Sequence, residues 1–268
     1  MYQDIQPHQF HNEYHPTAPV DGDIVFGFAD DQIIVKPDHT FFHYEELRQK
    51  HDFHYLFRVD DTNFYLSDVE TEEDTDALSF RAMRTYEPSY LAFAAITGWQ
   101  LYHWMEDNKH CGRCGEEMRP DAKERAMRCT KCGNIVYPKI MPAVIVGVEN
   151  DAHQILLTRY AHSTYTKFAL VAGFAEIGET IEETVKREVK EETGLNVTDL
   201  SFYKSQPWAF SSTLLMGFWA KAKGQQTISM DDGELKEADW YDRDVNVDNL
   251  DQASLTAEMI RAFKKGLY

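Results

Sequence analysis

Seven positions within residues 173–195 have the residue types and spacing of a metal-binding cluster of acids. The window reads GFAEIGETIEETVKREVKEETGL and fits the pattern G-x5-E-x7-R-E-U-x-E-E-x-G-U, in which U is aliphatic. The fixed positions are filled by Gly173, Glu179, Arg187, Glu188, Glu191, Glu192 and Gly194. Carboxylate oxygens are hard ligands, and such ligands select Mg²⁺ or Mn²⁺. The pattern therefore predicts a divalent-metal site built from glutamates.

The element that positions these acids is expected to be a helix over residues 180–193. That stretch holds no Pro or Gly and is rich in Glu, Lys, Val and Ile, a composition that favours a helix. Gly178 permits a loop before the helix, and Gly194 suits the left-handed conformation of a C-cap. We therefore expect a rigid helix held between two glycine turns.

The acids on this helix are not placed as they would be on an ordinary charged surface helix. Ile181 and Val185 begin an apolar stripe. At helical spacing the stripe continues onto Glu188 and Glu192, with Glu191 beside them. Acids in an inward-facing stripe are costly unless a cation compensates their charge. An ordinary surface helix with Glu–Lys pairs would explain the composition, but not acids on the apolar stripe.

All four cysteines of the chain fall in one segment, with the spacing C-x2-C-x14-C-x2-C. They are Cys111, Cys114, Cys129 and Cys132. Four thiolates suit a closed tetrahedral Zn²⁺ site, which has a structural role because no coordination position is open. The alternatives are two disulfides, which are disfavoured in a chain without a secretory signal, and a redox C-x-x-C pair, which rarely occurs doubled at this spacing.

The 268-residue chain has a formal net charge of -18, which argues against a broad nucleic-acid-binding surface. Residues 109–139 are the exception, with eight Lys or Arg residues against four acids. This basic segment either attracts an anionic substrate or consists of ordinary solvated charges.

Hydrophobic residues make up 43% of the chain, which is enough for packed cores. No run of about 18 apolar residues is present, so no membrane span is expected. The first residues, MYQDIQPHQFHNEYHP, lack the apolar stretch of a secretory signal. We expect a cytoplasmic protein without a membrane partner.

The order of expected elements indicates an α+β protein with three parts. Residues 1–105 favour a small α+β domain of short strands that ends in an amphipathic helix. Residues 106–138 are the expected zinc ribbon, and residues 139–268 the expected third domain. In that third domain, strands are expected near 143–148, 154–158, 200–203, 213–222 and 240–241, with helices at 180–193 and 254–265. Strands flanked by two helices indicate an α/β/α sandwich.

The acid-rich window matches the box of the Nudix hydrolases, and two further segments resemble one branch of that family. Residues 205–213 read SQPWAFSST, which is similar to the SQPWPFPxS signature of the NADH pyrophosphatase branch. Members of that branch also resemble this chain in carrying a four-cysteine zinc ribbon ahead of the box. The resemblance covers residue 88 to the end. It implies a Nudix α/β/α sandwich preceded by the ribbon and a small N-terminal α+β domain.

The resemblance implies a set of catalytic and metal-binding residues. The catalytic acids and ligands of Mg²⁺ or Mn²⁺ would be Glu188, Glu191, Glu192 and Glu234, together with the backbone carbonyl of Ala172. Of these, Glu234 belongs to the stretch GELKEADWY, which is similar to a further acidic motif of the branch. Glu179 and Arg187 would hold the geometry of the loop and the helix.

The resemblance also implies residues that contact the substrate. They are Phe174, Gln206, Pro207, Trp208, Ala209, Phe210, Ser211, Ser212 and Thr213, with Glu124 and Tyr137 near the substrate across a dimer interface. The aromatic rings would stack on a dinucleotide, while Gln206 and the hydroxyls would form hydrogen bonds to its edges. Ala209 and Ser211 stand where the family has prolines, and Thr213 replaces the closing serine. The missing prolines make the segment less preorganised.

The implied reaction is hydrolysis of the pyrophosphate of NADH or NAD⁺ to nicotinamide mononucleotide and AMP, by a homodimer. The same linkage occurs in a 5′ NAD cap on RNA, so removal of such caps is expected as a second activity. One alternative is a Nudix hydrolase for ADP-ribose, a dinucleoside polyphosphate or another nucleoside diphosphate derivative. The other is a nucleotide sensor without catalysis, which the complete set of box acids disfavours.

Overall fold

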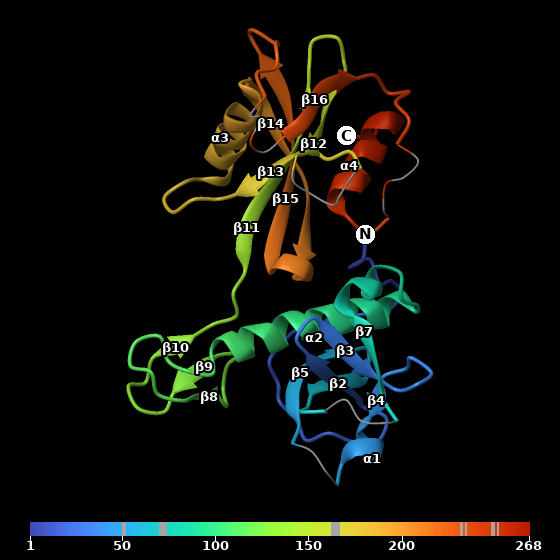
Figure 1. Ribbon diagram of the computed structural model, residues 1–268, viewed down its shortest axis with the longest axis vertical. Helices are drawn as coiled ribbons and strands as arrows, with labels where there is room; N and C mark the ends of the chain where they lie inside the picture. The colour runs from blue at the N-terminus through green and yellow to red at the C-terminus, as the bar shows by residue number, and fades with distance from the viewer. Residues whose placement is uncertain are drawn as a thin grey trace. The chain divides into compact units, whose positions relative to one another are not determined.

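The structure is a computed structural model that describes residues 1–49, 52–69, 74–161, 167–230, 233, 235–247, 250 and 252–268. The chain divides into two compact units (Figure 1). The N-terminal unit comprises Tyr2–Lys139, and the Nudix-box unit comprises Ile140–Tyr268 with Met1. The sequence predicts a finer division into three domains, with boundaries between residues 105 and 106 and between residues 138 and 139. This division stays a prediction.

The N-terminal unit contains a sheet whose described strands run in the order β1-β5-β6-β2-β3-β7, with β4 paired to β2. The pair of β2 and β6 is parallel, and the other pairs are antiparallel. The elements are β1 (Phe10–His11), β2 (Ile24–Ala29), β3 (Gln32–Val35), β4 (Phe42–His43), α1 (Tyr44–Leu47), β5 (His54–Val59), β6 (Thr62–Leu66), β7 (Asp76–Ser79) and the 3-10 helix η1 (Phe80–Arg84).

Helix α2 (Ser89–Asp107) packs closely on this sheet because small residues face it. Ala94 and Ala95 are fully buried. A Cβ on Gly98 would come within 2.9 Å of the Phe26 ring, so only glycine allows this approach. The helix starts directly after Pro88, as the sequence predicts, because proline suits the first turn of a helix.

The zinc-ribbon segment adds a three-stranded antiparallel sheet to the N-terminal unit. Its strands are β8 (Met118–Pro120), β9 (Met127–Cys129) and β10 (Ile135–Val136), in the order β10-β9-β8. The four cysteines flank these strands, so the short sheet holds their positions.

The Nudix-box unit is built on a mixed sheet with the strand order β14-β15-β11-β12-β16, in which β13 also pairs with β11. β11 and β15 are parallel, and the other pairs are antiparallel. Its elements are β11 (Met141–Glu149), β12 (Ile155–Tyr160), β13 (Val171–Phe174), α3 (Ile181–Thr193), β14 (Asn196–Trp208), the 3-10 helix η2 (Ala209–Ser211), β15 (Thr213–Lys223), β16 (Leu235–Tyr241) and α4 (Leu255–Lys265).

Alternation along β11 sends its side chains into two cores, one on each face of the sheet. Val144 and Val146 share a cluster with Val185 of α3. Ile145, between them, belongs to the cluster that contains Ile260 of α4. The two helices therefore cover opposite faces of the sheet, as Figure 1 shows for this unit. The α/β/α sandwich predicted from sequence is confirmed.

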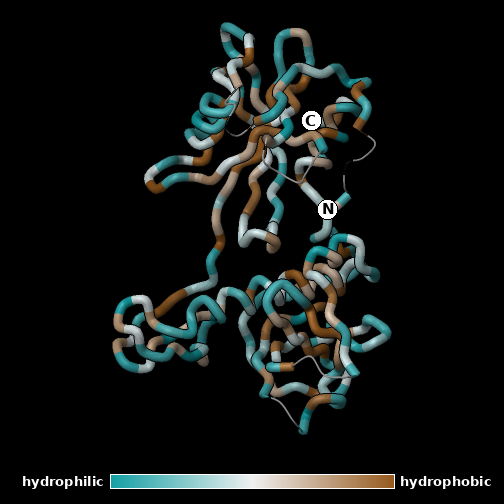
Figure 2. Tube along the Cα trace, viewed as in Figure 1, coloured by the Kyte–Doolittle hydropathy of each residue, from teal (hydrophilic) through white to brown (hydrophobic). Residues whose placement is uncertain are grey.

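Hydropathy follows these layers. Figure 2 shows hydrophobic residues along the central strands of the Nudix-box unit and hydrophilic residues along α3. Within the described part of the chain, no helix is long and apolar enough to cross a membrane.

Candidate active site

The sequence of α3 fixes the helix that carries the acids. The Thr180 hydroxyl accepts a hydrogen bond from the Glu183 amide at 3.2 Å, and the Glu183 carboxylate accepts one from the Thr180 amide at 2.8 Å. This is a capping box. The helix ends at Gly194, which has the left-handed conformation that the sequence predicts (φ 72°). Val185 and Val189 are fully buried and anchor the inner face.

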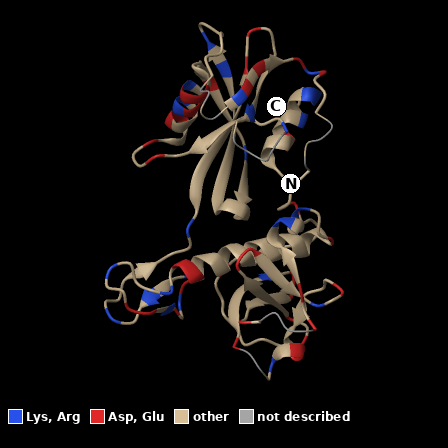
Figure 3. Ribbon diagram, in the orientation of Figure 1, with Lys and Arg blue, Asp and Glu red and all other residues tan. Residues whose placement is uncertain are grey.

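The inner face continues from the valines into two acids. Glu192 is only 2% exposed, and the Glu188 side chain is 13% exposed. The Glu191 side chain is 59% exposed, so it flanks the pair from the solvent side. Figure 3 shows acidic residues along α3 with basic residues among them. Buried carboxylates are costly without a compensating cation, so this face favours a cation site.

The first glycine of the box makes room for one of these carboxylates. Gly173 lies on β13, which pairs with β11. A Cβ at this position would lie 2.0 Å from Cδ of Glu188 and 2.1 Å from Oε1 of the same side chain. Any other residue here would displace the carboxylate. Glycine is therefore required by the packing of Glu188 against the strand.

Arg187 joins the acids to the loop before the helix. Its Nε and Nη2 donate to the two carboxylate oxygens of Glu179 at 2.5 and 2.9 Å. Its Nη1 donates to Glu188 at 2.7 Å and to Glu191 at 2.9 Å. Nη2 also donates to the backbone carbonyl of Phe174 at 2.9 Å. One guanidinium thus fixes the loop, the helix and the end of β13 relative to one another.

The Arg187 hydrogen bonds, with help from the Glu176 amide and the Thr184 hydroxyl, lower the pKa of Glu179 to about 2. The Thr184 hydroxyl donates to the same carboxylate at 3.0 Å and is fully buried. Sequence reasoning did not single out Thr184. Its signal was present, because a hydroxyl in the first turn of α3 reaches back to the preceding loop.

The donor set of this site fits a hard divalent cation. Ala172, whose carbonyl is a predicted ligand, pairs with Ile145 and directly precedes Gly173. The carboxylates of Glu188 and Glu191 each accept a hydrogen bond from Arg187 through one oxygen. Among the described residues, only the four cysteines form a cluster of three or more ligand atoms within 4.8 Å. The predicted acid Glu234 lies outside the described residues.

An exposed aromatic ring follows the first glycine of the box. Phe174, which ends β13 directly after Gly173, is 49% exposed. The position is compatible with stacking on a base, which the resemblance implies.

The Gln206 side chain lies inside the protein, whereas contact with a substrate would require an accessible side chain. Its side chain is fully buried. Its amide nitrogen donates to the Ala253 carbonyl at 2.8 Å, and its amide oxygen accepts from the Leu255 amide at 2.7 Å. Both polar ends are used inside the protein, where they hold the start of α4. The expected hydrogen bond from Gln206 to the edge of a base is therefore not supported, because the backbone competes for the same atoms.

The rest of the SQPW-like segment forms the end of β14 and the short helix that follows this strand. Pro207 and Trp208 close β14, and residues 209–211 form the 3-10 helix η2. The rings of Trp208 and Phe210 are both partly exposed and pack with centroids 4.9 Å apart. Ala209 and Thr213 are buried, at 2% and 4% exposure.

The hydroxyls of this segment bond to one another. The side-chain oxygens of Ser211 and Thr213 lie 2.8 Å apart, and Ser212 has a positive φ of 53°. Ser211 is exposed and Ser212 is partly exposed. The surface that this segment offers to a ligand is therefore made by Pro207, Trp208, Phe210, Ser211 and Ser212.

The four cysteine sulfurs form a tetrahedral cluster. Sγ of Cys114 lies 3.5 Å from those of Cys129 and Cys132, and Sγ of Cys111 lies 3.7 Å from that of Cys132. Zn–S bonds of about 2.3 Å place tetrahedral sulfurs roughly 3.8 Å apart. No disulfide links the four cysteines. The geometry fits the structural Zn²⁺ that the spacing predicts.

Hydrogen bonds from backbone amides lower the pKa of one of these thiols. The Cys132 amide donates to Sγ of Cys129 at 3.4 Å. This hydrogen bond is the main reason why the pKa of Cys129 falls to about 6. A thiol that ionises easily is suited to bind zinc as thiolate.

Glu124 and Tyr137, both expected near the substrate, contact each other in the N-terminal unit. The Tyr137 hydroxyl donates to the Glu124 carboxylate at 2.9 Å, and this carboxylate raises the pKa of Tyr137. Tyr137 is 55% exposed. The pair therefore presents a phenol and an acid together on the surface of the ribbon segment.

Comparison with known families agrees with this arrangement. A model described as "NUDIX domain" matches residues 139–263, and a model described as "NADH pyrophosphatase zinc ribbon domain" matches residues 106–137. A crystal structure of a NUDIX hydrolase from Nitrosomonas europaea has a TM-score of 0.50 at 24% identity, and covers 59% of this chain and 91% of that one. That structure shows the same fold.

Several curated relatives of this chain are named NAD-capped RNA hydrolase NudC. The protein of Vibrio vulnificus is 34% identical over 199 residues, which are 74% of this chain and 73% of that protein. The protein of Vibrio atlanticus is 38% identical over 67% of this chain and 65% of that protein. The protein of Escherichia coli (strain SMS-3-5 / SECEC) is 40% identical over 54% of this chain and 55% of that protein. The matches thus span between about half and three quarters of these relatives.

Both matching domains occur here in the order that the sequence predicts. The chain therefore belongs to the Nudix hydrolase family, in the group that carries an NADH pyrophosphatase zinc ribbon.

Proposed function

We propose that this protein hydrolyses the pyrophosphate of NADH or NAD⁺ and releases nicotinamide mononucleotide and AMP. The observation that carries the proposal is the buried pair Glu188 and Glu192, of which Glu188 packs against Gly173, the residue directly before the exposed ring of Phe174. The NAD moiety in the name of the relatives supports this substrate class. The zinc ribbon and the SQPW-like segment support the same branch of the family.

In this proposal the metal-binding residues are the acids of the box together with one backbone oxygen. They are Glu188, Glu191, Glu192, Glu234 and the carbonyl of Ala172. Divalent ions held there would neutralise the diphosphate and supply a bound water of lowered pKa. Arg187 orients Glu188 and Glu191 on the helix through its hydrogen bonds.

The reaction joins a water oxygen to one phosphorus and breaks the bond between that phosphorus and the bridging oxygen. The bridging oxygen keeps the electron pair and leaves as part of a monophosphate. A carboxylate of the cluster takes up the proton of the water. Phe174, Trp208 and Phe210 offer the aromatic faces that hold the bases.

We extend the proposal to three further properties. The protein would also remove NAD caps from RNA, because the cap contains the same pyrophosphate and the relatives are named for that activity. It would act as a homodimer, in which the pair Glu124 and Tyr137 of one protomer approaches the substrate of the other. It would work in the cytoplasm, where reducing conditions keep the four thiols available to zinc.

The first test compares Glu192→Gln with wild-type protein on NADH, NAD⁺, ADP-ribose, a dinucleoside polyphosphate and NAD-capped RNA. Products are separated by chromatography after incubation with Mg²⁺ or Mn²⁺. We expect nicotinamide mononucleotide and AMP from NADH, and a rate at least about a hundredfold lower in the variant. Glu182→Gln is the matched control, because Glu182 is an exposed acid on the outer face of α3.

The outcomes separate the candidate functions. Cleavage of ADP-ribose or a dinucleoside polyphosphate but not of NADH would keep the Nudix chemistry and reject NAD(H) as substrate. The two missing prolines, at Ala209 and Ser211, are the reason for including these alternative substrates. Tight binding without any cleavage would support the sensor. Wild-type turnover by Glu192→Gln would reject the assignment of the site.

A further inference from the structure

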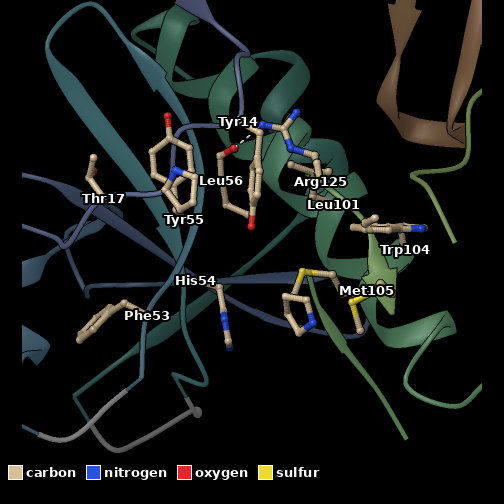
Figure 4. A pocket seen from close by; sticks show the side chains of 14 residues that line it. Tyr14, Thr17, Phe53, His54, Tyr55, Leu56, Leu101, Trp104, Met105 and Arg125 are labelled. Carbon is tan, nitrogen blue, oxygen red and sulfur yellow. Dashed lines mark hydrogen bonds between the residues drawn. The ribbon is translucent and has the colours of Figure 1, made fainter. Parts of the chain in front are cut away.

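The N-terminal unit contains a cavity of about 200 Å³ that involves no residue of the Nudix-box unit. Its walls come from the N-terminal arm, β5, the end of α2 and the zinc-ribbon segment. Figure 4 shows Tyr14 and Arg125 at one end of the cavity, with His54 and Met105 at the other. Four segments that are distant in sequence therefore converge on one space.

A larger chamber of about 560 Å³ adjoins this cavity. The two chambers share the side chains of His54, Met105, Pro120 and Met127. Ligand sites in proteins enclose about 300–1,000 Å³. The larger chamber by itself has the size of a site for a small molecule.

Arg125 gives the smaller chamber a positive charge. Its Nη1 donates to Asn12 Oδ1 and its Nη2 donates to the Leu56 carbonyl, both at 2.6 Å. Both acceptors are neutral, and the partly buried guanidinium has no carboxylate partner among the described residues. Burial lowers the pKa of this arginine, which still leaves it charged at neutral pH. An anion in the chamber would supply the opposite charge.

Aromatic and methionine side chains form the walls next to this charge. The Arg125 guanidinium lies 5.6 Å from the centre of the Tyr14 ring. Tyr55 and Trp104 line the same cavity, and Met105 and Met127 line both chambers. Planar rings bind to aromatic faces and to methionine thioethers. A ligand with a flat ring and an anionic group would match these walls.

The larger chamber fixes the orientation of such a ligand. Its lining includes Asp52, Asp68 and Glu106, with His54 and Lys109 as its basic residues. An anionic group is therefore favoured at Arg125, and the uncharged ring is favoured toward the shared methionines. The partly buried guanidinium of Arg125, which has no acid partner among the described residues, attracts an anion by its charge.

We propose that this cavity binds one nucleotide, with its phosphate at Arg125 and its base against the aromatic rings and methionines that line the walls. Aromatic stacking combined with an arginine–phosphate contact is how proteins hold single nucleotides. The nucleotide is either a free mononucleotide or one unit of a single-stranded RNA. The site is separate from the acids of α3, and its occupation does not depend on the proposed hydrolysis.

The test follows methionine methyl resonances by NMR in the full-length, zinc-bound protein without added Mg²⁺ or Mn²⁺. Met105 and Met127 are two of the nine methionines, and Met→Leu variants assign their signals. We expect AMP to shift both signals in a saturable way. Adenosine and inorganic phosphate, each lacking one half of the ligand, should bind at least about tenfold more weakly.

Three variants and one control connect these shifts to the cavity. Arg125→Met should weaken AMP binding at least about tenfold, while Arg125→Lys, which keeps the charge, should retain part of it. Tyr14→Leu removes an aromatic wall without touching the charge and should also weaken binding. Arg119→Met is the control, because Arg119 is an exposed arginine of the same segment, paired with Glu117 at 3.3 Å.

Unfolding curves and zinc content identify any variant that fails to fold. If Arg125→Met fails to fold, the test of the cavity uses Tyr14→Leu instead. A 5′-hydroxyl oligoribonucleotide that binds more tightly than AMP, with loss in the same variants, would identify RNA as the source. Equal binding would identify free mononucleotide. The proposal is overturned if neither probe shifts Met105 and Met127, or if the shifts persist unchanged in Arg125→Met and Tyr14→Leu.

Discussion

Arg187 is the side chain on which the geometry of the Nudix site depends most. It makes five hydrogen bonds, to Glu179, Glu188, Glu191 and the Phe174 carbonyl. A guanidinium has five donors in one plane, whereas a lysine offers a single point of charge. The box therefore requires arginine at this position for geometry as well as for charge.

The pKa of Glu179 leads to a prediction on acid stability. The pKa falls from 4.5 to about 2, chiefly through the hydrogen bonds from Arg187. A lowered pKa in the folded state contributes stability above pH 4.5, and this contribution is lost as pH falls through 2. Wild-type protein should therefore unfold at a higher temperature than Glu179→Gln near neutral pH, and the difference should shrink between those two pH values.

Thermal unfolding of both proteins across that pH range measures the difference. Glu182→Gln serves as the control, because Glu182 is exposed on the same helix. A difference that stays constant down to pH 2 would contradict the role of the Arg187–Glu179 pair.

At the scale of elements, Gln206 connects β14 to the beginning of α4. The Leu255 amide belongs to the first helical residue of α4 and has no acceptor within the helix. The Gln206 side chain supplies that acceptor and bonds to the Ala253 carbonyl as well. Gln206→Leu should destabilise the fold by about 1–3 kcal/mol, because it leaves buried backbone groups without partners.

Chemical denaturation measures this loss, and substrate kinetics distinguish it from a binding role. We expect a lower free energy of unfolding with little change in KM. The matched control is Gln225→Leu, at an exposed glutamine after β15. A raised KM with unchanged stability would instead show that Gln206 contacts the substrate.

Elements differ in how far local sequence determines them. The bounds of α3 follow from the Thr180 cap and from Gly194, which are signals inside the segment itself. For β14, the sequence predicts only a strand at 200–203, but the strand extends over Asn196–Trp208. It is long because β15 pairs with it along nearly its whole length. Pairing with β15, and not the local strand propensity of the segment, sets the length of β14.

At the scale of the whole molecule, two compact units predict two unfolding transitions. The zinc cluster belongs to the unit Tyr2–Lys139, so removal of zinc should affect the transition of that unit alone. Bound structural zinc supplies folding energy directly. A chelator, or the ligand variant Cys132→Ser, should lower the unfolding temperature of this unit and leave that of the Nudix-box unit unchanged.

Calorimetry of the full-length protein resolves these transitions. Thr130→Ser is the matched control, because Thr130 lies between Cys129 and Cys132 in the chain and carries no thiol. Equal shifts of both transitions on zinc removal would contradict independent units.

The sequence predicts both groups of metal-ligating side chains. The box acids and the four cysteines are close to one another along the chain, and one helix and two tight turns are enough to gather each group. The burial of Gln206 under α4 and the cavity around Arg125 are seen only in the folded chain. These features depend on contacts between segments far apart in sequence, and spacing along the chain does not carry information about which distant segments will meet.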